Sequence, residues 1–350
     1  ERLAVARGRY GYDGQPCIAK ITLPGNTTGA LARALEGQYR AALVLGDSIC
    51  PKPLYFGPDG DRILFAYEDS GSETLLKDIE RAPLPTAEAV RIAWAVAATA
   101  FRMHRKGWHH RAIRPNHVLI KPDGEALLIG LGSARQVSSR ERDDYSPPAR
   151  LECMAYLAPE QTGILDRPVD WRADLFSVAA ILYALLTGRP PFAGAARQDI
   201  LDRCADTPPP AAGSLRPGVP SFLDAIIAKA MAKDPDGRYA TMPGFLADLY
   251  RAREGNTENA EAGAFDRPES FFSAWPGDPP GMAGALEAIE RSFPGDETAQ
   301  RAVFARVMAA TGDGPPDTGA VLAGLAREGI ASYDRDKGAW SFASTQAAGG

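Results

Sequence analysis

The chain has few of the residues that metal sites and disulfides use. Among its 350 residues are four histidines and four cysteines, and the cysteines stand far apart at positions 17, 50, 153 and 204. No C-x-x-C pair of the kind found in zinc and redox sites is therefore present. We expect reduced, partly buried thiols in a cytoplasmic protein.

Long apolar runs are also missing. The longest uncharged apolar stretch, LFSVAAILYALLTG at residues 175–188, is shorter than the roughly 20 residues that a membrane-spanning helix needs, so it predicts a buried core helix. The sequence begins at Glu1 rather than Met and shows no signal peptide. We expect a piece of a longer polypeptide, with no membrane partner.

Neither a basic tract nor a nucleotide-binding Walker motif occurs. The formal net charge is -5 and is spread along the chain, so no basic face is available for a phosphate backbone. We expect no nucleic-acid partner. No internal repeat and no G-x-x-x-x-G-K-[ST] sequence is visible. With 45% apolar residues the chain can bury a large core.

Apolar periodicity predicts an α+β fold with two lobes over residues 1–254. Up to about residue 68, short apolar runs alternate with turns and surround one helical stretch between Gly29 and Gly46, which predicts a small β-rich lobe. Residues 69–254 predict a large helical lobe. Its helices are interrupted at NHVLIKPDGEALLIG, which predicts two short strands about a Pro-Asp-Gly turn.

The last part of the chain predicts a separate small unit. Residues 255–280 are rich in Gly, Pro and acidic residues and are typical of a linker. Residues 281–350 predict a helical module that ends in a hairpin about a charged turn containing Gly338. Its helices are expected near residues 281–293, 297–310 and 317–328. This arrangement resembles a winged-helix module.

Six segments match, in order, the signature motifs of eukaryotic-like (Hanks-type) protein kinases. CIAK resembles the strand that carries the family's lysine, and MHRKGWHHRAIRPNHVL resembles the catalytic loop. LLIGLGSAR resembles the D-F-G segment, and MAYLAPEQTG resembles the A-P-E segment. VDWRADLFSVAAILYALLTGRPPF resembles the long buried helix of the large lobe, and AKDPDGRYATM a segment near its end. The resemblance covers roughly residues 15 to 250 and implies a bacterial serine/threonine kinase fold.

A narrower resemblance comes from LECMAYLAPEQTGILDRPVDWRADLFS, residues 151–177. This stretch is similar to the kinase-like heads of large bacterial proteins that also carry an ATPase and a sensor histidine kinase.

The catalytic positions implied by the resemblance are degenerate. Ala112 replaces the aspartate that accepts the substrate's proton, while His117 and Gly130 replace the asparagine and the aspartate that hold magnesium. If the match to the family motif were shifted by one residue, Asn116 would take the place of His117. The flanking residues RP and VL, which also match the motif, fix the register against that shift. Imidazole is a poor magnesium ligand. We expect no catalytic residue and no metal ligand here, although Arg114 keeps the charge of the family's loop lysine.

Two residues of the small lobe are candidates for binding a nucleotide. The resemblance implies that Lys20 reaches the ATP phosphates and that Gln38 replaces the glutamate that pairs with it. Helical spacing places Gln38 in the middle of the apolar stripe formed by Leu31, Leu35, Ala42 and Leu45. Glu36 points away from that stripe. The alternative is that Lys20 only packs its stem on the sheet.

No glycine-rich phosphate lid is found. RGRYGYDGQ has glycines at positions 8, 11 and 14, and this spacing so close to Lys20 predicts a β-turn between two strands.

Residues that keep the family's framework are present: His110, Arg111, Gly132, Glu160, Asp174 and Arg238. The resemblance implies that Glu160 and Arg238 form a buried ion pair. It also implies that Asp174 holds the catalytic loop through backbone amides.

These features together predict a catalytically impaired pseudokinase, a regulatory or protein-binding module in bacterial signal transduction. Its partner would be a protein or a neighbouring domain of a longer signalling polypeptide. No cofactor is certain, and ATP without magnesium stays open. So do two alternatives: an active or atypical kinase that uses non-standard residues, and a decaying copy with no role.

Two local questions also stay open. Residues 138–150 predict a solvated loop, with phosphorylation of Ser138, Ser139, Tyr145 or Ser146 as the alternative. Leu131 and the aromatic ILFAY stretch would either fill the adenine site or frame it.

Overall fold

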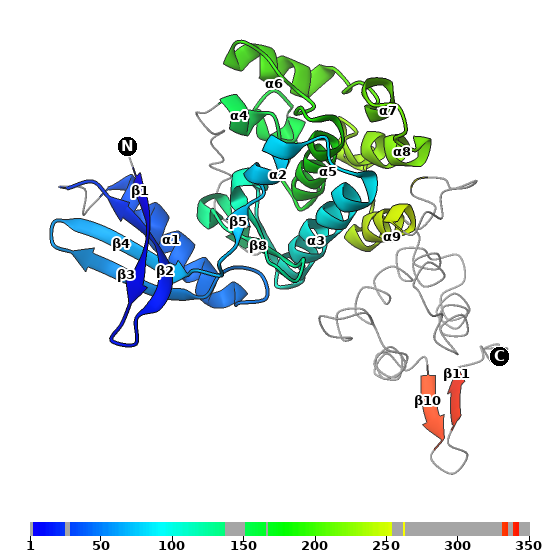
Figure 1. Cartoon of the computed structure of the whole chain (residues 1–350). Coiled ribbons are helices and arrows are strands. Elements are labelled where there is room, and N and C mark those ends of the chain that lie inside the picture. Colours follow the sequence, from blue (N-terminus) through cyan, green and yellow to red (C-terminus); the bar gives the residue numbers. More distant parts are fainter. Residues whose placement is uncertain are drawn as a thin grey trace.

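The computed structural model describes residues 3–24, 29–136, 151–165, 167–253, 262, 331–334 and 339–342. Within these ranges a β-rich lobe and a larger helical lobe lie next to each other (Figure 1). The linker and the three helices expected after residue 254 lie outside the described residues, Ala262 apart.

The small lobe is built on an antiparallel sheet of four strands in the order β1-β2-β4-β3. Its strands are β1 (Leu3–Tyr10), β2 (Gln15–Thr22), β3 (Pro53–Asp59) and β4 (Arg62–Glu68). Between β1 and β2 the chain turns at Gly11 and Gly14, which adopt φ angles of 75° and 67° that favour glycine. This confirms the predicted turn; Gly8 lies within β1.

Helix α1 (Ala30–Leu45) is the single helix of the described small lobe (Figure 1). Leu35, Ala42 and Leu45 are buried and Leu31 is half-buried, so the predicted apolar stripe faces inward. Leu35 packs with aromatic residues of β4, whereas Leu45 belongs to the core of the large lobe. The helix therefore bridges the two lobes.

The large lobe surrounds helix α5 (Arg172–Thr187). Every residue of α5 from Ala173 to Leu186 is buried, which confirms the predicted core helix. A helix that is apolar on all sides must be enclosed by other elements. The other helices of the lobe are α2 (Leu76–Arg81), α3 (Thr86–Arg105), α4 (Leu151–Met154), α6 (Arg197–Asp206), α7 (Ala212–Leu215), α8 (Ser221–Ala230) and α9 (Met242–Arg253).

Short strands and 3-10 turns occur in the loops of the large lobe. β5 (Glu73–Thr74), β7 (Val118–Ile120) and β8 (Ala126–Leu128) form one sheet, and β6 (Trp108–His109) pairs with β9 (Arg135–Gln136). The β7–β8 pair confirms the predicted strands about the Pro-Asp-Gly turn. The 3-10 turns are η1 (Pro115–His117), η2 (Leu131–Ser133), η3 (Pro159–Gln161) and η4 (Pro235–Gly237).

Three further findings complete the description. β10 (Ala331–Asp334) and β11 (Ala339–Phe342) pair antiparallel, as expected for the C-terminal hairpin. All four cysteines are free and buried. Within the described part of the chain, no helix combines the length and the apolar character that crossing a membrane requires.

Candidate functional site

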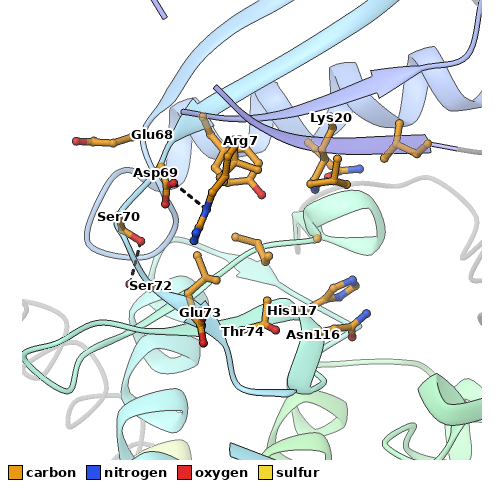
Figure 2. Close-up of a pocket in the computed structure, with 18 of the residues that line it drawn as sticks. Arg7, Lys20, Glu68, Asp69, Ser70, Ser72, Glu73, Thr74, Asn116 and His117 are labelled. Carbon is orange, nitrogen blue, oxygen red and sulfur yellow. Dashed lines mark hydrogen bonds and ion pairs between the residues drawn. The ribbon is translucent and has the colours of Figure 1, made fainter. Parts of the chain in front are cut away.

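A cleft of about 680 Å³ opens between the two lobes. Strands β1, β2 and β4 contribute residues to its upper side, and the segments 114–119 and 129–133 contribute to its floor (Figure 2). This volume lies within the roughly 300–1,000 Å³ that small-molecule sites occupy. The cleft is thus large enough for a small-molecule ligand.

Neither Leu131 nor the aromatic strand β4 fills the cleft. Leu131 is 5% exposed and packs in the core of the large lobe, so it does not line the cleft. Phe65 faces a separate, smaller space behind Lys20. Tyr67 lines the cleft.

Lys20 and Gln38 meet at the inner side of the cleft. Nζ of Lys20, on β2, donates a hydrogen bond of 2.8 Å to Oε1 of Gln38, on α1. The ammonium group also lies 5.8 Å and 5.6 Å from the ring centres of Phe65 and Tyr67. Burial lowers the pKa of Lys20 to about 8, because Gln38 offers an acceptor but no negative charge. Glu36 instead pairs with Arg40 on the outer face of α1.

His117 occupies the space that a side chain at position 130 would need. Gly130 has φ 76°, and a Cβ atom placed on it would lie 2.5 Å from Nε2 of His117. Real Cβ atoms do not approach other heavy atoms this closely, so an aspartate at position 130 requires His117 to move. His117, and not Asn116, is therefore the residue beside Gly130.

The hydrogen bonds of His117 show that its ring is neutral. Nη2 of Arg114 donates to Nε2 of His117 at 2.9 Å, so Nδ1 carries the proton and donates to the carbonyl oxygen of Ala112 at 2.8 Å. Burial and the positive charge of Arg114 lower the pKa of His117 well below its ordinary value. Arg114 also donates to Oδ1 of Asn116 at 3.0 Å.

The position at which the kinase resemblance implies a general base offers no acid or base. Ala112 is 7% exposed, and its backbone N–H donates to Nδ1 of His110 at 3.2 Å. His110 donates in turn from Nε2 to the carbonyl oxygen of Ile129 at 3.0 Å. Burial keeps the pKa of His110 low, so this imidazole is also neutral.

Asp174, at the start of α5, holds the catalytic loop. Its carboxylate accepts hydrogen bonds from the backbone N–H groups of His110 at 2.8 Å and Arg111 at 2.7 Å. Nε2 of His104 donates to the same carboxylate at 2.8 Å. Burial opposes ionisation of Asp174, but these bonds lower its pKa. Arg111 has φ 62°, and the two bonds stabilise this uncommon conformation.

Glu160 and Arg238 form a fully buried, two-pronged ion pair. Both Nη atoms of Arg238 donate to the carboxylate of Glu160 at 2.7 Å. Arg238 also donates to the carbonyl oxygen of Arg172, the first residue of α5. The pair therefore joins η3, η4 and α5. Gly132 is the remaining residue of the family's framework. A Cβ atom placed on it would lie 3.3 Å from Nε2 of Gln38.

The residues at the expected metal positions do not fit a magnesium ion. Magnesium prefers hard oxygen ligands. Gly130 has no side chain, and both nitrogens of His117 are already used in hydrogen bonds. The serine and tyrosine positions of the 138–146 segment lie outside the described residues.

The outer side of the cleft carries ion pairs that the sequence did not indicate. Nε of Arg7, on β1, lies 3.1 Å from Oδ2 of Asp69 (Figure 2). Glu73 pairs with Lys77 of α2. These residues belong to no recognisable motif. Only the pairing of the strands brings β1 next to the segment after β4.

Comparison with known proteins gives one family and several bacterial relatives. The model of the protein kinase domain family matches residues 55–246. The serine/threonine-protein kinase PknL of Mycobacterium tuberculosis is 36% identical over 176 residues, which cover 50% of this chain and 43% of PknL. The probable serine/threonine-protein kinase PknB of Bifidobacterium longum is 37% identical over 162 residues, 45% of this chain and 23% of that protein. The chain thus matches less than half of the length of these relatives.

Proposed function

The chain belongs to the protein kinase family, and on that premise we propose that it is a pseudokinase, which has the kinase fold but does not transfer phosphate. The observation that carries this proposal is the chemistry of the cleft floor: a methyl group at Ala112, a neutral imidazole at His117 and no side chain at Gly130. Loss of a general base typically costs about 100-fold to 10,000-fold in rate. Phosphoryl transfer also depends on metal ions that neutralise the phosphates.

The retained framework supports a binding or regulatory role. Asp174 still holds the loop, and Glu160 still pairs with Arg238, although the groups that act on phosphate are missing. We propose a cytoplasmic module of bacterial signal transduction whose partner is a protein or a neighbouring domain of a longer polypeptide. The resemblance of residues 151–177 to the kinase-like heads of multidomain signalling proteins supports this role. Nucleotide would enter the cleft without a metal.

A second candidate function is an active or atypical serine/threonine kinase. The printed names of the relatives favour it, since they are serine/threonine-protein kinases. In this case Lys20 would contact the nucleotide, and acidic residues at non-standard positions would hold the metal.

A phosphate-transfer assay separates the two candidates. The full chain is incubated with γ-labelled ATP, magnesium or manganese, and a general protein substrate, and label on the chain and on the substrate is counted. We expect no transfer above a blank without protein. The variant Ala112→Asp/His117→Asn/Gly130→Asp, which restores all three positions, is expected to gain activity. Metal-dependent transfer by the parent chain that Lys20→Met abolishes would overturn the pseudokinase proposal.

A further inference from the structure

Another groove, of about 540 Å³, lies in the large lobe and not between the lobes. Residues 208–212, between α6 and the start of α7, form one wall, and α8 with residues 231–233 forms the other. In Figure 1, α7 and α8 lie on the side of the large lobe that is away from the small lobe. We call this space the α8 groove.

The α8 wall of the groove is apolar between two charged residues, Asp224 and Lys233. Asp224, Ile227, Ala228 and Met231 are three or four positions apart, so they share one face of the helix. Ile227 and Met231 are buried, whereas Ala228 is exposed. The small side chain of Ala228 therefore leaves the groove open beside an apolar floor.

The opposite wall is stiff and cannot act as a strand partner. Pro208 and Pro210 are exposed, and Pro209 is half-buried. A proline ring fixes the φ angle and removes the backbone N–H, so three prolines in a row offer apolar surface but no donor for a β ladder. An occupant of the groove must therefore be recognised by its side chains. The wall itself loses little conformational freedom when it is contacted.

The two charged residues bond to neutral backbone groups. Both carboxylate oxygens of Asp224 accept from the backbone N–H of Gly213, at 3.1 Å and 3.2 Å. Nζ of Lys233 donates to the carbonyl oxygens of Cys204 at 2.7 Å and Arg203 at 3.3 Å, in the last turn of α6. Neither Asp224 nor Lys233 forms an ion pair with another residue of the described part of the chain.

The positions of the two charges define the length of a matching ligand. Burial lowers the pKa of Lys233 to about 8, so a nearby carboxylate would stabilise its charged form. From position 224 to position 233 the distance along α8 is roughly 13 Å, at about 1.5 Å per residue. An extended peptide covers this distance in about four residues of roughly 3.3 Å each.

We propose that the α8 groove binds an extended segment of a partner protein that carries a basic and an acidic residue four positions apart, with apolar residues between them. The basic side chain lies beside Asp224 and the acidic one beside Lys233. Ion pairs at such partly exposed sites contribute modestly, so the apolar contact with α8 and the prolines supplies most of the affinity. The charges supply the selectivity. This proposal rests on the binding role proposed above and names the chemistry of the partner.

Fluorescence polarisation with the full chain tests the charge match. The probes are two labelled peptides with blocked ends, RLALE and LRELA. They have the same composition, but only RLALE has its charges four positions apart. RLALE is expected to bind about 3-fold to 10-fold more tightly, because LRELA reaches one pole of the groove at a time.

Two conservative variants assign the preference to the poles. Asp224→Asn keeps an acceptor for Gly213, and Lys233→Gln keeps donors for the carbonyl groups of α6. Each is expected to weaken RLALE binding by about 2-fold to 5-fold and to change LRELA binding by less than about 2-fold. An unchanged preference for RLALE in both variants would contradict the proposal.

A matched pair of tryptophan variants assigns the binding to the groove. Ala228→Trp fills the space beside α8 from an exposed position and is expected to weaken RLALE binding by more than about 10-fold. Ala87→Trp makes the same change at an exposed position of α3 outside the groove and is expected to change the affinity by less than about 2-fold. Thermal melts confirm that each variant is folded.

Three results would overturn the proposal. The first is equal affinity for the two peptides, and the second is equal loss of binding in the two tryptophan variants. The third is no saturable binding with the chain at about 0.5 mM, which excludes a Kd below about 1 mM. Dimerisation of the chain that Ala228→Trp alone prevents would also contradict it, since a second copy would then occupy the groove.

The transfer assay on the same preparations separates this proposal from the proposed function. Phosphate transfer by a chain that binds RLALE selectively contradicts only the pseudokinase. Absence of both transfer and peptide binding contradicts only the α8 groove.

Discussion

At the scale of single residues, His117 has two effects on the cleft. It accepts a hydrogen bond from Arg114 and so orients that guanidinium, and it excludes any side chain from position 130. The first effect requires a neutral ring, because protonated Nε2 cannot accept a bond from Arg114, whereas the second is steric. The chemistry of the cleft floor therefore depends on the protonation of one imidazole.

Acid is expected to destabilise the protein through its buried histidines. The pKa values of His110 and His117 are lowered in the folded state, so the unfolded chain binds more protons as pH falls below about 6.5. Their contribution to stability is complete above that pH and is lost below it. Each such group adds up to about 1.4 kcal/mol per pH unit to the slope of the unfolding free energy.

Urea denaturation between pH 5 and pH 7.5 checks this expectation. His117→Gln keeps one donor and one acceptor but does not titrate, so its slope against pH should be shallower than that of the parent chain. Parallel curves for the two proteins would show that His117 does not titrate on unfolding.

The sequence predicted some residue contacts and missed others. Helical periodicity placed Gln38 on the inner face of α1, and the resemblance placed Lys20 opposite, so their hydrogen bond could be anticipated. The contact between His117 and Gly130 could not. It depends on how the hairpin of β7 and β8 brings the ends of η1 and η2 together, and no local pattern encodes that distance.

At the scale of elements, the Glu160–Arg238 pair connects turns that are distant in sequence. Arg238 follows η4, Glu160 lies in η3, and Arg238 also bonds to the carbonyl oxygen of Arg172 at the start of α5. Both side chains are fully buried, so neither can exchange its partner for water. The ion pair therefore helps to position η3, together with Gln161, whose Nε2 donates to the carbonyl oxygen of Arg111 at 2.7 Å.

Glu160→Gln is expected to lower the unfolding free energy by about 3–5 kcal/mol, because it leaves the charge of Arg238 buried and uncompensated. Urea denaturation measures the change. Glu36→Gln is the matched control: it breaks an exposed pair with Arg40 and should cost less than about 1 kcal/mol. Similar costs for the two variants would show that the buried pair is not needed for stability.

Long elements were predictable and short ones were not. The uniform apolar run of α5 and the turn between β7 and β8 have strong sequence patterns, and both were predicted. Strands β6 and β9 each have two residues, which is too short for any alternation to be recognised. They form because the neighbouring elements bring their backbones together.

At the scale of the whole molecule, hydrogen bonds join the end of α1 and the segment after it to the large lobe. Nζ of Lys106, after α3, donates to the carbonyl oxygen of Leu45 at 2.7 Å, at the C-terminal end of α1. The backbone N–H of Leu128 donates to the carbonyl oxygen of Ile49 at 2.7 Å. A cation at this end of a helix is favourable, because the last carbonyl groups have no partner within the helix.

Lys106→Met is therefore expected to loosen the last turn of α1. Amide hydrogens of residues 42–46 should exchange with solvent about 2-fold to 5-fold faster, while those of α5 stay unchanged. Hydrogen exchange read by mass spectrometry, with Lys121→Met as the charge-matched control, measures this. Equal exchange in α1 of both variants would mean that Lys106 does not stabilise that end.

The two-lobe α+β architecture was predictable from the order of the kinase motifs, but the state of the cleft was not. Whether Leu131 enters the cleft or packs below α1 depends on the volumes of its neighbours. The sequence names those neighbours but does not place them.

The contact between His117 and Gly130 also couples substitutions at the two positions. A first substitution of Gly130 by aspartate would force a side chain against His117 and disturb the loop before any metal could bind. A first substitution of His117 by asparagine would remove the ring nitrogen that accepts the bond from Arg114 and would leave position 130 without a side chain. Each position thus constrains substitution at the other, so the two residues are expected to change together.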